Sequence, residues 1–369
     1  MPLSILASNG RHRRPVDLIA SSTGRCPLTN PVAVAPYLVA EEGYCVVVRA
    51  LEDKQGYNQL EAADGTFHTV RKDMVFVGTL GERQALKGYS GRIPRRIAPG
   101  DVLHLLNMGG IIGLCTSDHP DLGPALRVEV LGAALVELDD TRAHARIQDY
   151  ALEPAFTLSH SAPLVMVSGT AMNTGKTHAA AHIVRGLTER GWRVAAAKLT
   201  GASLRRDVRM MQESGAVACA TFNDAGVVAS TNKDMAPFAK GIIAHLNEAV
   251  PDVIVLELGD GFIGYYGVDD LLLDKELQRF TRAHVVAATD LAGAWAADHL
   301  FRDRYRAPIT AIVGPVTDNA VGKQYIQNAL GIPAHNALQD TGALVETVAR
   351  AVAGASLSTV PYALAGVAL

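Results

Sequence analysis

The sequence predicts a mixed α/β protein, with a mostly parallel sheet covered by helices on both faces and a smaller β-rich domain before it. Three observations support this fold class. After residue 163, continuous apolar runs alternate with helical patterns. Between residues 37 and 138, short aliphatic and β-branched runs are separated by Gly, Pro and Asp. A glycine-rich turn within residues 166–184 joins an apolar run to a helical pattern.

The composition is that of an ordinary globular protein. The chain has 369 residues, 49% of them hydrophobic and 19% charged, which is enough for two domains. The formal net charge of −3 provides no overall positive field, so neither nucleic acid nor a membrane is expected as a partner. No apolar run suggests a secretory signal or a membrane span, and the four cysteines lack CxxC spacing. We therefore expect a cytoplasmic protein with reduced thiols.

Composition and periodicity divide the chain into four parts. Residues 1–150 are expected to form the β-rich N-terminal domain, whose role the sequence leaves open. Residues 151–162 read as a linker, because they have no sustained period and lie in a proline-containing stretch. Residues 163–350 form the α/β domain, and residues 351–369 an apolar tail.

The expected elements follow from these patterns. In the N-terminal domain, strands are expected in "YCVVVRAL", "FHTVRKDMVFVGTL", "GDVLHLLNMGGIIGLC" and "ALRVEVLGAALVEL". In the α/β domain, strands and helices are expected to alternate through "PLVMVSG", "KTHAAAHIVRGLTERG", "WRVAAAKLTG", "LRRDVRMMQESGA", "VVAST", "FAKGIIAHLNEAV", "DVIVLELGDG", "LLLDKELQRFTRA", "HVVAATD", "AGAWAADHLF", "ITAIVGPVTD", "VGKQYIQNALG" and "IPAHNAL".

The turn "SGTAMNTGKT" (168–177) has the composition of a phosphate-binding loop. Backbone N–H groups at such a loop and at the following helix N-terminus bind an anion. Lys176 would reach the β- and γ-phosphates, and the Thr177 hydroxyl would complete a Mg²⁺ shell. The residues expected to bind nucleotide here are Gly169, Thr170, Asn173, Thr174, Gly175, Lys176 and Thr177. The motif predicts a P-loop NTPase domain that binds ATP and Mg²⁺.

The spacing of this loop resembles that of the dethiobiotin synthetase family of P-loop NTPases. Five residues separate the two glycines, as in that family. The common form of the phosphate-loop motif has four residues there. A second match is "AAAKLTG" (195–201), because the second strand of the family ends in a lysine that faces the phosphates and the substrate. The resemblance makes Lys198 its counterpart and covers only about residues 163–340. Read from the residues alone, Lys198 lies where α/β ligands bind, or is a strand-end lysine that reaches solvent.

Three acidic residues are candidates for holding Mg²⁺. Glu257 and Asp260 follow the apolar run in "DVIVLELGDG", at the expected carboxyl end of a strand. The resembled family has Glu-Gly-Ala-Gly-Gly here, which Glu257 matches and Asp260 does not, so Asp260 either shares the metal or is a turn residue. Asp207 lies where related NTPases often place a second metal-linked aspartate. Its other interpretation is an exposed helix acid paired with Arg206 or Arg209.

Base recognition is expected late in the domain, as in the resembled family. The segment "AIVGPVTDNAVGKQY" (311–325) places Thr317 and Asn319, with Asp318 between them, where they would contact a purine. "STNKD" (230–234) invites comparison with a guanine-reading motif, but it precedes the strand of Glu257 instead of following it. We therefore expect ATP in preference to GTP.

Other polar clusters have weaker functional interpretations. Arg205, Arg206 and Arg209 would bind a substrate carboxylate or phosphate, or simply form a solvated helix face. His178 and His182 have helical metal-ligand spacing, but a third ligand is missing from the sequence nearby, which favours ordinary core or surface histidines.

Two activities of related NTPases are not expected, because the sequence lacks their characteristic features. It contains neither the glutaminase domain of the corrin-amidating relatives nor the extra loop lysine of partition ATPases. The remaining resemblance implies ATP-dependent activation of a small-molecule carboxylate or carbamate by γ-phosphoryl transfer, followed by amine attack to form an amide, urea or ring. Lys176, Lys198 and Glu257 would be the catalytic residues. The resemblance also implies a homodimer.

Two other functions remain open at this point. A small-molecule kinase would use the same residues with Asp207 as the base. A regulatory or metallochaperone NTPase would act on a partner protein. The glycine-rich stretch "LNMGGIIGLCTSDHP" of the N-terminal domain is expected to close over the sheet edge or to supply substrate specificity.

Overall fold

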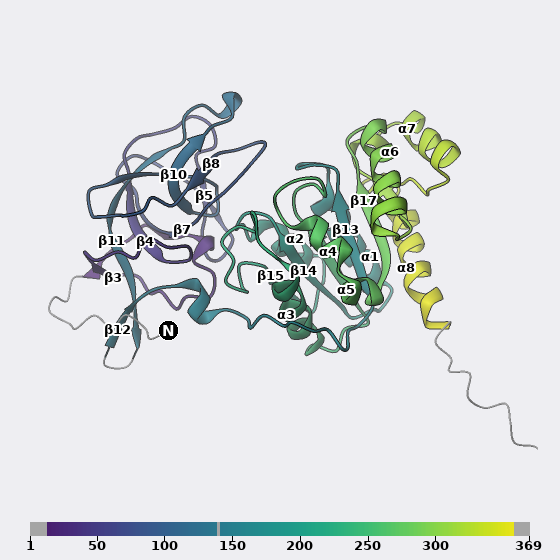
Figure 1. Ribbon diagram of the computed structural model, residues 1–369, viewed down its shortest axis with the longest axis horizontal. Helices are drawn as coiled ribbons and strands as arrows, with labels where there is room; N and C mark the ends of the chain where they lie inside the picture. Colours follow the sequence, from purple (N-terminus) through teal and green to yellow (C-terminus); the bar gives the residue numbers. More distant parts are fainter. Residues whose placement is uncertain (1–12, 139–140, 358–369) are drawn as a thin grey trace, which may run out of the picture.

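The computed structural model describes residues 13–138 and 141–357 (Figure 1). The first twelve residues of the expected N-terminal domain and the part of the expected apolar tail beyond residue 357 lie outside the described residues. Residues 351–357, which the sequence analysis assigned to that tail, belong to helix α8 (Thr341–Leu357). No helix in the described part of the chain is both long and apolar enough to cross a membrane.

The N-terminal region is built from strands, which confirms the predicted β-rich domain. Its strands are β1 (Arg13–Arg14), β2 (Leu18–Ile19), β3 (Val32–Ala35), β4 (Cys45–Ala50), β5 (Gln59–Glu61), β6 (Phe67–Thr69), β7 (Val75–Leu80), β8 (Ser90–Arg92), β9 (Val102–Leu105), β10 (Ile111–Ser117), β11 (Arg127–Leu138) and β12 (Thr141–His144). The main path of its large sheet runs β1-β3-β11-β4-β7-β10-β8. Along β4, Val47 faces one buried cluster while Val46 and Val48 face the other, so both faces of the sheet are covered.

The C-terminal region has the predicted parallel sheet. Its strands are β13 (Leu164–Gly169), β14 (Val194–Thr200), β15 (Ala218–Thr221), β16 (Val253–Leu258), β17 (Thr281–Ala287) and β18 (Ala311–Val313). Their order is β15-β14-β16-β13-β17-β18, and every neighbouring pair in this path is parallel. The central strands are buried on both faces, which explains their continuous apolar sequences.

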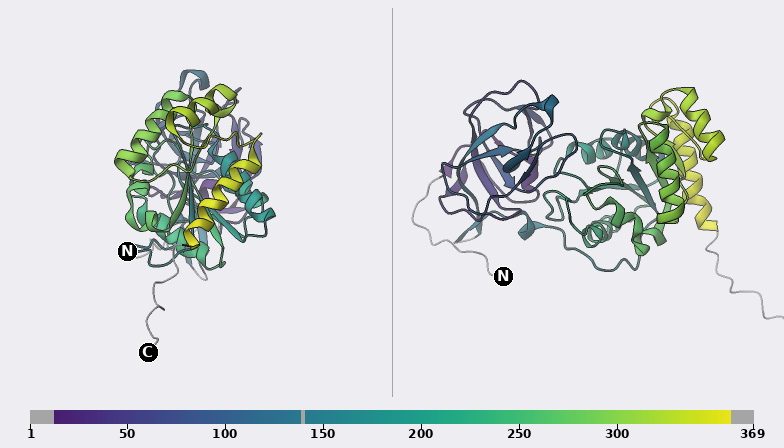
Figure 2. Two further views of the ribbon diagram at one scale, coloured as in Figure 1. Left: turned by 90° about the vertical axis from the view of Figure 1, so that its right-hand side faces the viewer. Right: turned by 45° about the horizontal axis from the view of Figure 1, so that its top comes forward.

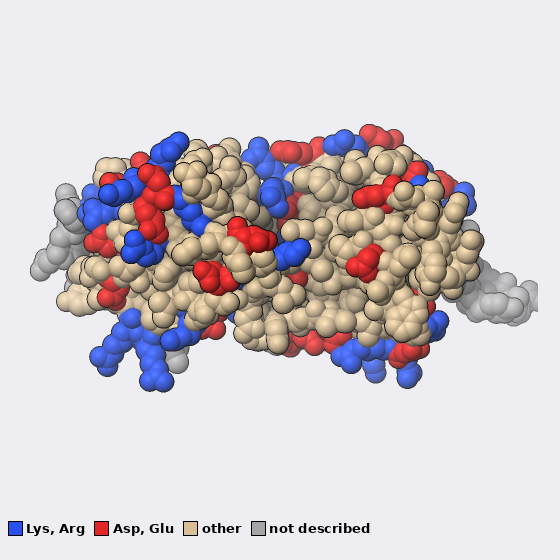
Figure 3. Space-filling model, turned by 90° about the horizontal axis from the view of Figure 1, so that it is seen from above, with Lys and Arg blue, Asp and Glu red and all other residues tan. Residues whose placement is uncertain are grey.

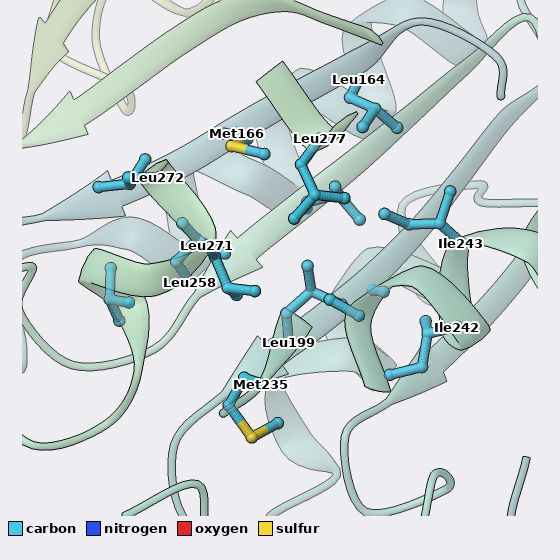
Figure 4. Close-up of a cluster of buried hydrophobic side chains, with 14 of the residues drawn as sticks. Leu164, Met166, Leu199, Met235, Ile242, Ile243, Leu258, Leu271, Leu272 and Leu277 are labelled. Carbon is cyan, nitrogen blue, oxygen red and sulfur yellow. The ribbon is translucent and has the colours of Figure 1, made fainter. Parts of the chain in front are cut away.

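Helices cover both faces of this sheet, as the sequence predicts (Figures 1 and 2). Helices α1 (Lys176–Glu189), α2 (Arg206–Glu213) and α8 pack on one face. Helices α3 (Ala236–Asn247), α4 (Val268–Leu273), α5 (Lys275–Phe280) and α6 (Leu291–Leu300) pack on the other, and α7 (Ala320–Tyr325) follows β18. Figure 4 shows part of the second core, where Leu164 and Met166 of β13 lie among Leu271, Leu272 and Leu277.

Three expected elements differ in the structure. The segment "VVAST" (227–231) is not a strand of the parallel sheet. The third strand of this sheet in chain order is β15, formed by "ACAT". The backbone groups of 227–231 bond instead to the loop after β14, through Ser230 N to Gly201 O and Ser203 N to Val228 O. "IPAHNAL" makes only an isolated bridge, between Ala334 and Ile312. The expected helix "LLLDKELQRFTRA" divides into α4 and α5 at Asp274, whose carboxylate caps α5.

The two regions are joined by buried contacts. The Glu61 carboxylate, at the end of β5, accepts the backbone N–H groups of Arg205 and Arg206 at 2.6 Å each, and so caps the start of α2. The Asn107 side chain donates to the Ser203 carbonyl at 2.7 Å. Val228 is fully buried in a cluster of N-terminal residues. These contacts place the N-terminal domain against the carboxyl edge of the parallel sheet.

Candidate functional site

The register of the sheet aligns three strand ends at its carboxyl edge. Glu257 of β16 lies opposite Val167 of β13 on one side and opposite Lys198 of β14 on the other. Val167 is followed directly by the phosphate loop. Because the carboxyl ends of parallel strands meet at one edge, the loop, Lys198 and Glu257 come together there.

The phosphate loop has the backbone that its glycines predict. Gly175 has a φ of +87°, and a Cβ on Gly169 would lie 2.7 Å from the Thr174 Oγ1. Asn173 also adopts a positive φ of +58°. Lys176 begins helix α1 and is 5% exposed, with its Nζ donating to the Ala171 carbonyl at 2.6 Å. The loop therefore holds the lysine at a helix N-terminus, where an anion is stabilised.

Thr177 and Glu257 form a pair suited to Mg²⁺. The Thr177 hydroxyl donates to Glu257 Oε1 at 2.9 Å, while the buried Oε2 of Glu257 has no hydrogen-bond partner among the described residues. Burial raises the pKa of Glu257, and the nearby Lys198 and Lys176 partly oppose that rise. The described residues contain no group of three His, Cys, Asp or Glu side chains suited to a metal. One hydroxyl and one carboxylate fit Mg²⁺, which takes its other ligands from phosphate and water.

Lys198 lies in a buried ion pair with Asp207. Its Nζ donates to Asp207 Oδ2 and lies 3.9 Å from Glu257 Oε1. Burial by itself would lower the pKa of Lys198, but the carboxylates of Asp207 and Glu257 raise it, so the ammonium stays charged. The strand-end lysine that reaches solvent is therefore not what the structure shows, since Lys198 is 8% exposed.

The two other acids predicted to hold the metal take different positions. Asp207 is 5% exposed and is bonded to Lys198 and Arg206, so its carboxylate serves the lysine and is not an exposed helix acid. Asp260 has a φ of +71° in the turn after β16 and lines the cleft described below. Burial raises the pKa of Asp260, against the charges of Lys176, Arg83 and Lys198.

The residues expected to contact a purine have other partners. Thr317 is fully buried, and its hydroxyl donates to the Gly314 and His335 carbonyls. The Asn319 side chain caps helix α7 by accepting Val321 N–H. The structure does not bring Thr317 or Asn319 to the cleft. The loop itself does come close to the phosphate loop, since Gly314 Cα would lie 3.9 Å from a Cβ on Gly175.

The segment "STNKD" lies at the contact between the two domains. Lys233 forms an ion pair with Glu42 of the N-terminal domain at 2.9 Å, and Asn232 N–H donates to the Tyr265 carbonyl. These contacts give the segment a structural role in joining the domains.

Of the remaining polar candidates, some form ion pairs within the protein and others line the cleft. Arg205 pairs with Asp224, and Arg209 pairs with Glu213 at 2.9 Å. His178 is exposed and lines the cleft, as does Arg206. The four cysteines are unpaired.

A cleft of about 620 Å³ joins the phosphate loop to the N-terminal domain. Figure 3 shows basic and acidic side chains close to one another where the two halves of the molecule meet. One side of the cleft carries the predicted Lys176, Thr177, Lys198, Asp207, Glu257 and Asp260. Asn107 and Met108 also line the cleft and belong to the glycine-rich stretch expected to cover the sheet edge, whereas Tyr57, Arg83, Lys87 and Tyr266 were not predicted.

One signal in the sequence pointed to the N-terminal side of the cleft. The stretch "LNMGGIIGLC" brings Asn107 and Met108 to the sheet edge, as expected for a loop that covers it. A Cβ on Gly109 would overlap the Ser203 carbonyl oxygen, so only glycine permits this approach. Nothing in the sequence pointed to Tyr57, Arg83 or Lys87, because their role depends on how the domains meet.

Comparisons with known proteins add little. No family model and no curated protein matches the sequence. Similar solved structures include the signal recognition particle receptor FtsY from Elizabethkingia anophelis, with 13% identity and a TM-score of 0.37 over 55% of this chain and 70% of that one. Signal recognition particle 54 kDa protein from Aeropyrum pernix, in complex with GDP, has 17% identity and a TM-score of 0.35 over 57% and 51% of the two chains. HypB from Helicobacter pylori, in complex with nickel, has 11% identity and a TM-score of 0.36 over 54% and 89%.

These scores are too low to assign a family or an activity. The P-loop NTPase fold of the C-terminal domain is shown by its own features instead. They are the parallel sheet between helices and the loop that leads from β13 into Lys176.

The pair of Thr177 and Glu257 leads to a prediction about metal dependence. Glu257→Gln removes the carboxylate charge at the proposed Mg²⁺ position while keeping its shape. We expect the Mg²⁺ concentration for half-maximal nucleotide hydrolysis to rise about tenfold or more, since Mg²⁺ prefers charged oxygen ligands. A metal titration of hydrolysis measures this. An unchanged titration would assign the ligand to Asp260 or Asp207.

The environment of Lys176 leads to a prediction about pH. Burial lowers the pKa of Lys176 to about 8, so the ammonium is charged below that pH and neutral above it. The phosphates favour the charged form, and the dissociation constant for Mg-nucleotide should therefore rise roughly tenfold between about pH 7 and pH 9. Titration of the protein with Mg-nucleotide across this window measures it. An affinity that stays constant to pH 9 would contradict the assignment.

Proposed function

We propose that the protein transfers the γ-phosphoryl group of a Mg-bound nucleotide, ATP in preference to GTP, to a small carboxylate or carbamate in the interdomain cleft. An amine then attacks the activated carbon, the bond from that carbon to the phosphate oxygen breaks, and inorganic phosphate and a proton leave, which forms an amide, a urea or a ring. One observation carries this proposal. Lys176, Lys198 and Glu257 open into a cleft whose other side is formed by a second domain, which leaves room for a small acceptor beside the phosphates. The resemblance of the loop and of "AAAKLTG" to dethiobiotin synthetase supports the same chemistry.

The side chains present match the needs of this transfer. A carboxylate oxygen attacks the γ-phosphorus, the bond to the bridging oxygen of the β-phosphate breaks, and the nucleoside diphosphate leaves. Negative charge spreads over the transferring group, where Lys176 and Lys198 stabilise it. Asp207 holds the Lys198 ammonium in place and keeps it charged. Thr177 and Glu257 would hold Mg²⁺, which neutralises charge on the phosphates.

The second domain also limits water at the reacting groups. An acyl phosphate must be kept from hydrolysis until the amine arrives. The loops around Lys87 and Met108 line the cleft on the side facing the phosphate loop. Buried contacts, such as that between Asn107 and Ser203, join the two domains beside the cleft.

The test is release of nucleoside diphosphate from Mg-ATP by the purified protein, alone and with pools of carboxylic acids, amines and bicarbonate. Release stimulated by an acid, and further by an amine, supports the proposal. Stimulation by an alcohol instead would indicate a small-molecule kinase. Slow release that ignores every pool and rises only with a partner protein would indicate a regulatory or metallochaperone NTPase.

A further inference from the structure

A buried arginine of the N-terminal domain lines the cleft. Arg83 is 4% exposed and is fixed through its backbone, whose N–H and C=O pair with Gly91. The loop that follows it wraps the guanidinium, because a Cβ on Gly88 would lie 2.8 Å from Arg83 Nη2. The side chain is thus held in one place at the cleft surface.

Among the described residues, Arg83 has hydrogen bonds but no carboxylate within ion-pair distance, and the charge of Asp260 acts on it only from further away. Its Nη1 donates to the Leu106 carbonyl and lies 3.4 Å from the Tyr57 hydroxyl. Its Nε has no acceptor. Among the described residues, the ion pairs with N–O separations up to 4.0 Å do not include Arg83. A buried guanidinium without a directly paired carboxylate is costly, so its position beside a cleft points to an anion supplied by a ligand.

The surroundings of Arg83 suit a single carboxylate. The hydroxyls of Tyr57 and Tyr266 flank the guanidinium, and each would donate a hydrogen bond to a bound carboxylate. Exposed Lys87 from the same loop adds one further positive charge to the cleft. Asp260 also lines this space and would repel a dianion more than a monoanion. A planar carboxylate matches the bidentate geometry of arginine.

The phosphates of the nucleotide already have their own partners. The loop N–H groups, Lys176 and Lys198 lie on the opposite domain from Arg83. An anion held at Arg83 would therefore be bound from the other side of the cleft, and filling the phosphate loop with a nucleotide separates the two sites experimentally.

We propose that Arg83, with Tyr57 and Tyr266, forms an anchoring site for a carboxylate of the acceptor substrate, and that the N-terminal domain is thereby the part of the protein that selects it. This inference rests on the proposed function for the reacting end of the substrate. It adds that the substrate carries a carboxylate as a recognition group, held on the N-terminal side of the cleft.

The test measures binding of simple acids with the phosphate loop already filled. The full-length protein, saturated with Mg-ADP, is titrated by calorimetry with acetate, succinate and benzoate. Each acid is matched by its primary amide, and inorganic phosphate is a separate arm. We expect at least one acid to bind in the millimolar range while its amide binds at least about tenfold more weakly. Failure of every acid to bind would overturn the inference.

Variants assign the binding to Arg83. Arg83→Met should weaken the acid at least about thirtyfold, and Arg83→Lys about tenfold because it keeps the charge but loses the fork. Arg49→Lys is the matched control, since Arg49 pairs with Glu129 on the same domain and does not line the cleft. Mg-ADP affinity should stay within about twofold in all three, which shows that they are folded. If Arg83→Met does not fold, Arg83→Lys decides.

The outcomes separate this inference from the proposed function. Acid binding that survives both Arg83 substitutions, or an amide that binds as well as its acid, would overturn the anchoring site. Binding of phosphate but not of carboxylates with Mg-ADP present would overturn it too. Acids that bind through Arg83 but never stimulate release of ADP from ATP would support the site and contradict the proposed transfer.

Discussion

Lys176→Ala is expected to raise the dissociation constant for Mg-nucleotide at least about a hundredfold, because it removes a charge-assisted contact to the phosphates in a buried site. Lys176 is 5% exposed at the start of helix α1, and the hydrogen bonds of its ammonium to described residues stay within the loop, to Ala171 and Thr174. Its removal therefore disturbs few other contacts. Titration with a fluorescent Mg-nucleotide gives the constant directly.

Lys323→Ala provides the control for this loss. Lys323 pairs with Asp340 at 2.8 Å in the same domain and does not line the cleft. Its substitution should leave nucleotide affinity unchanged within about twofold, since the contact is distant from the phosphates. If Lys176→Ala bound nucleotide as tightly as the unaltered protein, residues 168–177 would not be a phosphate-binding loop.

The second large effect concerns turnover. Lys198→Ala should lower kcat about a thousandfold or more while the nucleotide dissociation constant changes only a few-fold, because the lysine stabilises charge that builds up during transfer. The readout is turnover with the acceptor that stimulates release of the diphosphate. Full turnover in this variant would show that Lys198 has no catalytic role.

This substitution also carries a structural cost that a second variant separates. Without Lys198, the carboxylates of Asp207 and Glu257 remain buried without their cation, which costs about 3–5 kcal/mol. Lys240 is a matched control, because it is 7% exposed and pairs with Asp274 and Glu276 at 2.8 and 2.7 Å. Lys240→Ala should also lose stability in a thermal melt, by a smaller amount because the Glu276 side chain is 39% exposed and stays solvated without the lysine, and it should keep turnover. Equal loss of turnover in both variants would indicate a structural effect alone.

Local patterns were enough to predict most of the parallel domain. The apolar run that became β13 and the helical period that became α1 are strong signals, and the structure places both as expected. "VVAST" (227–231) has the same apolar composition as a strand but is buried at the contact between domains, where Val228 enters the N-terminal core. An apolar composition predicts that a segment is buried, but it does not predict whether the segment is buried in the sheet or against another domain.

The candidate site shows the same division. Gly175, Lys176 and Thr177 are adjacent in the sequence, so their spacing alone indicated a phosphate loop. The ion pair of Lys198 and Asp207 depends on the geometry of the loop between β14 and α2, which the sequence does not specify. Arg83 lines the cleft because the two domains meet there, and the sequence around it contains no motif that indicates a binding residue.

The central claim is that the cleft activates a carboxylate by phosphoryl transfer. Trapping with hydroxylamine tests it most directly, because hydroxylamine attacks an acyl phosphate and yields a stable hydroxamate. The protein would be incubated with Mg-ATP, hydroxylamine and the acid that best stimulates release of ADP, and both products would be counted. The account predicts one hydroxamate for each ADP, with none formed by Lys198→Ala. Release of ADP and phosphate with no hydroxamate would contradict it.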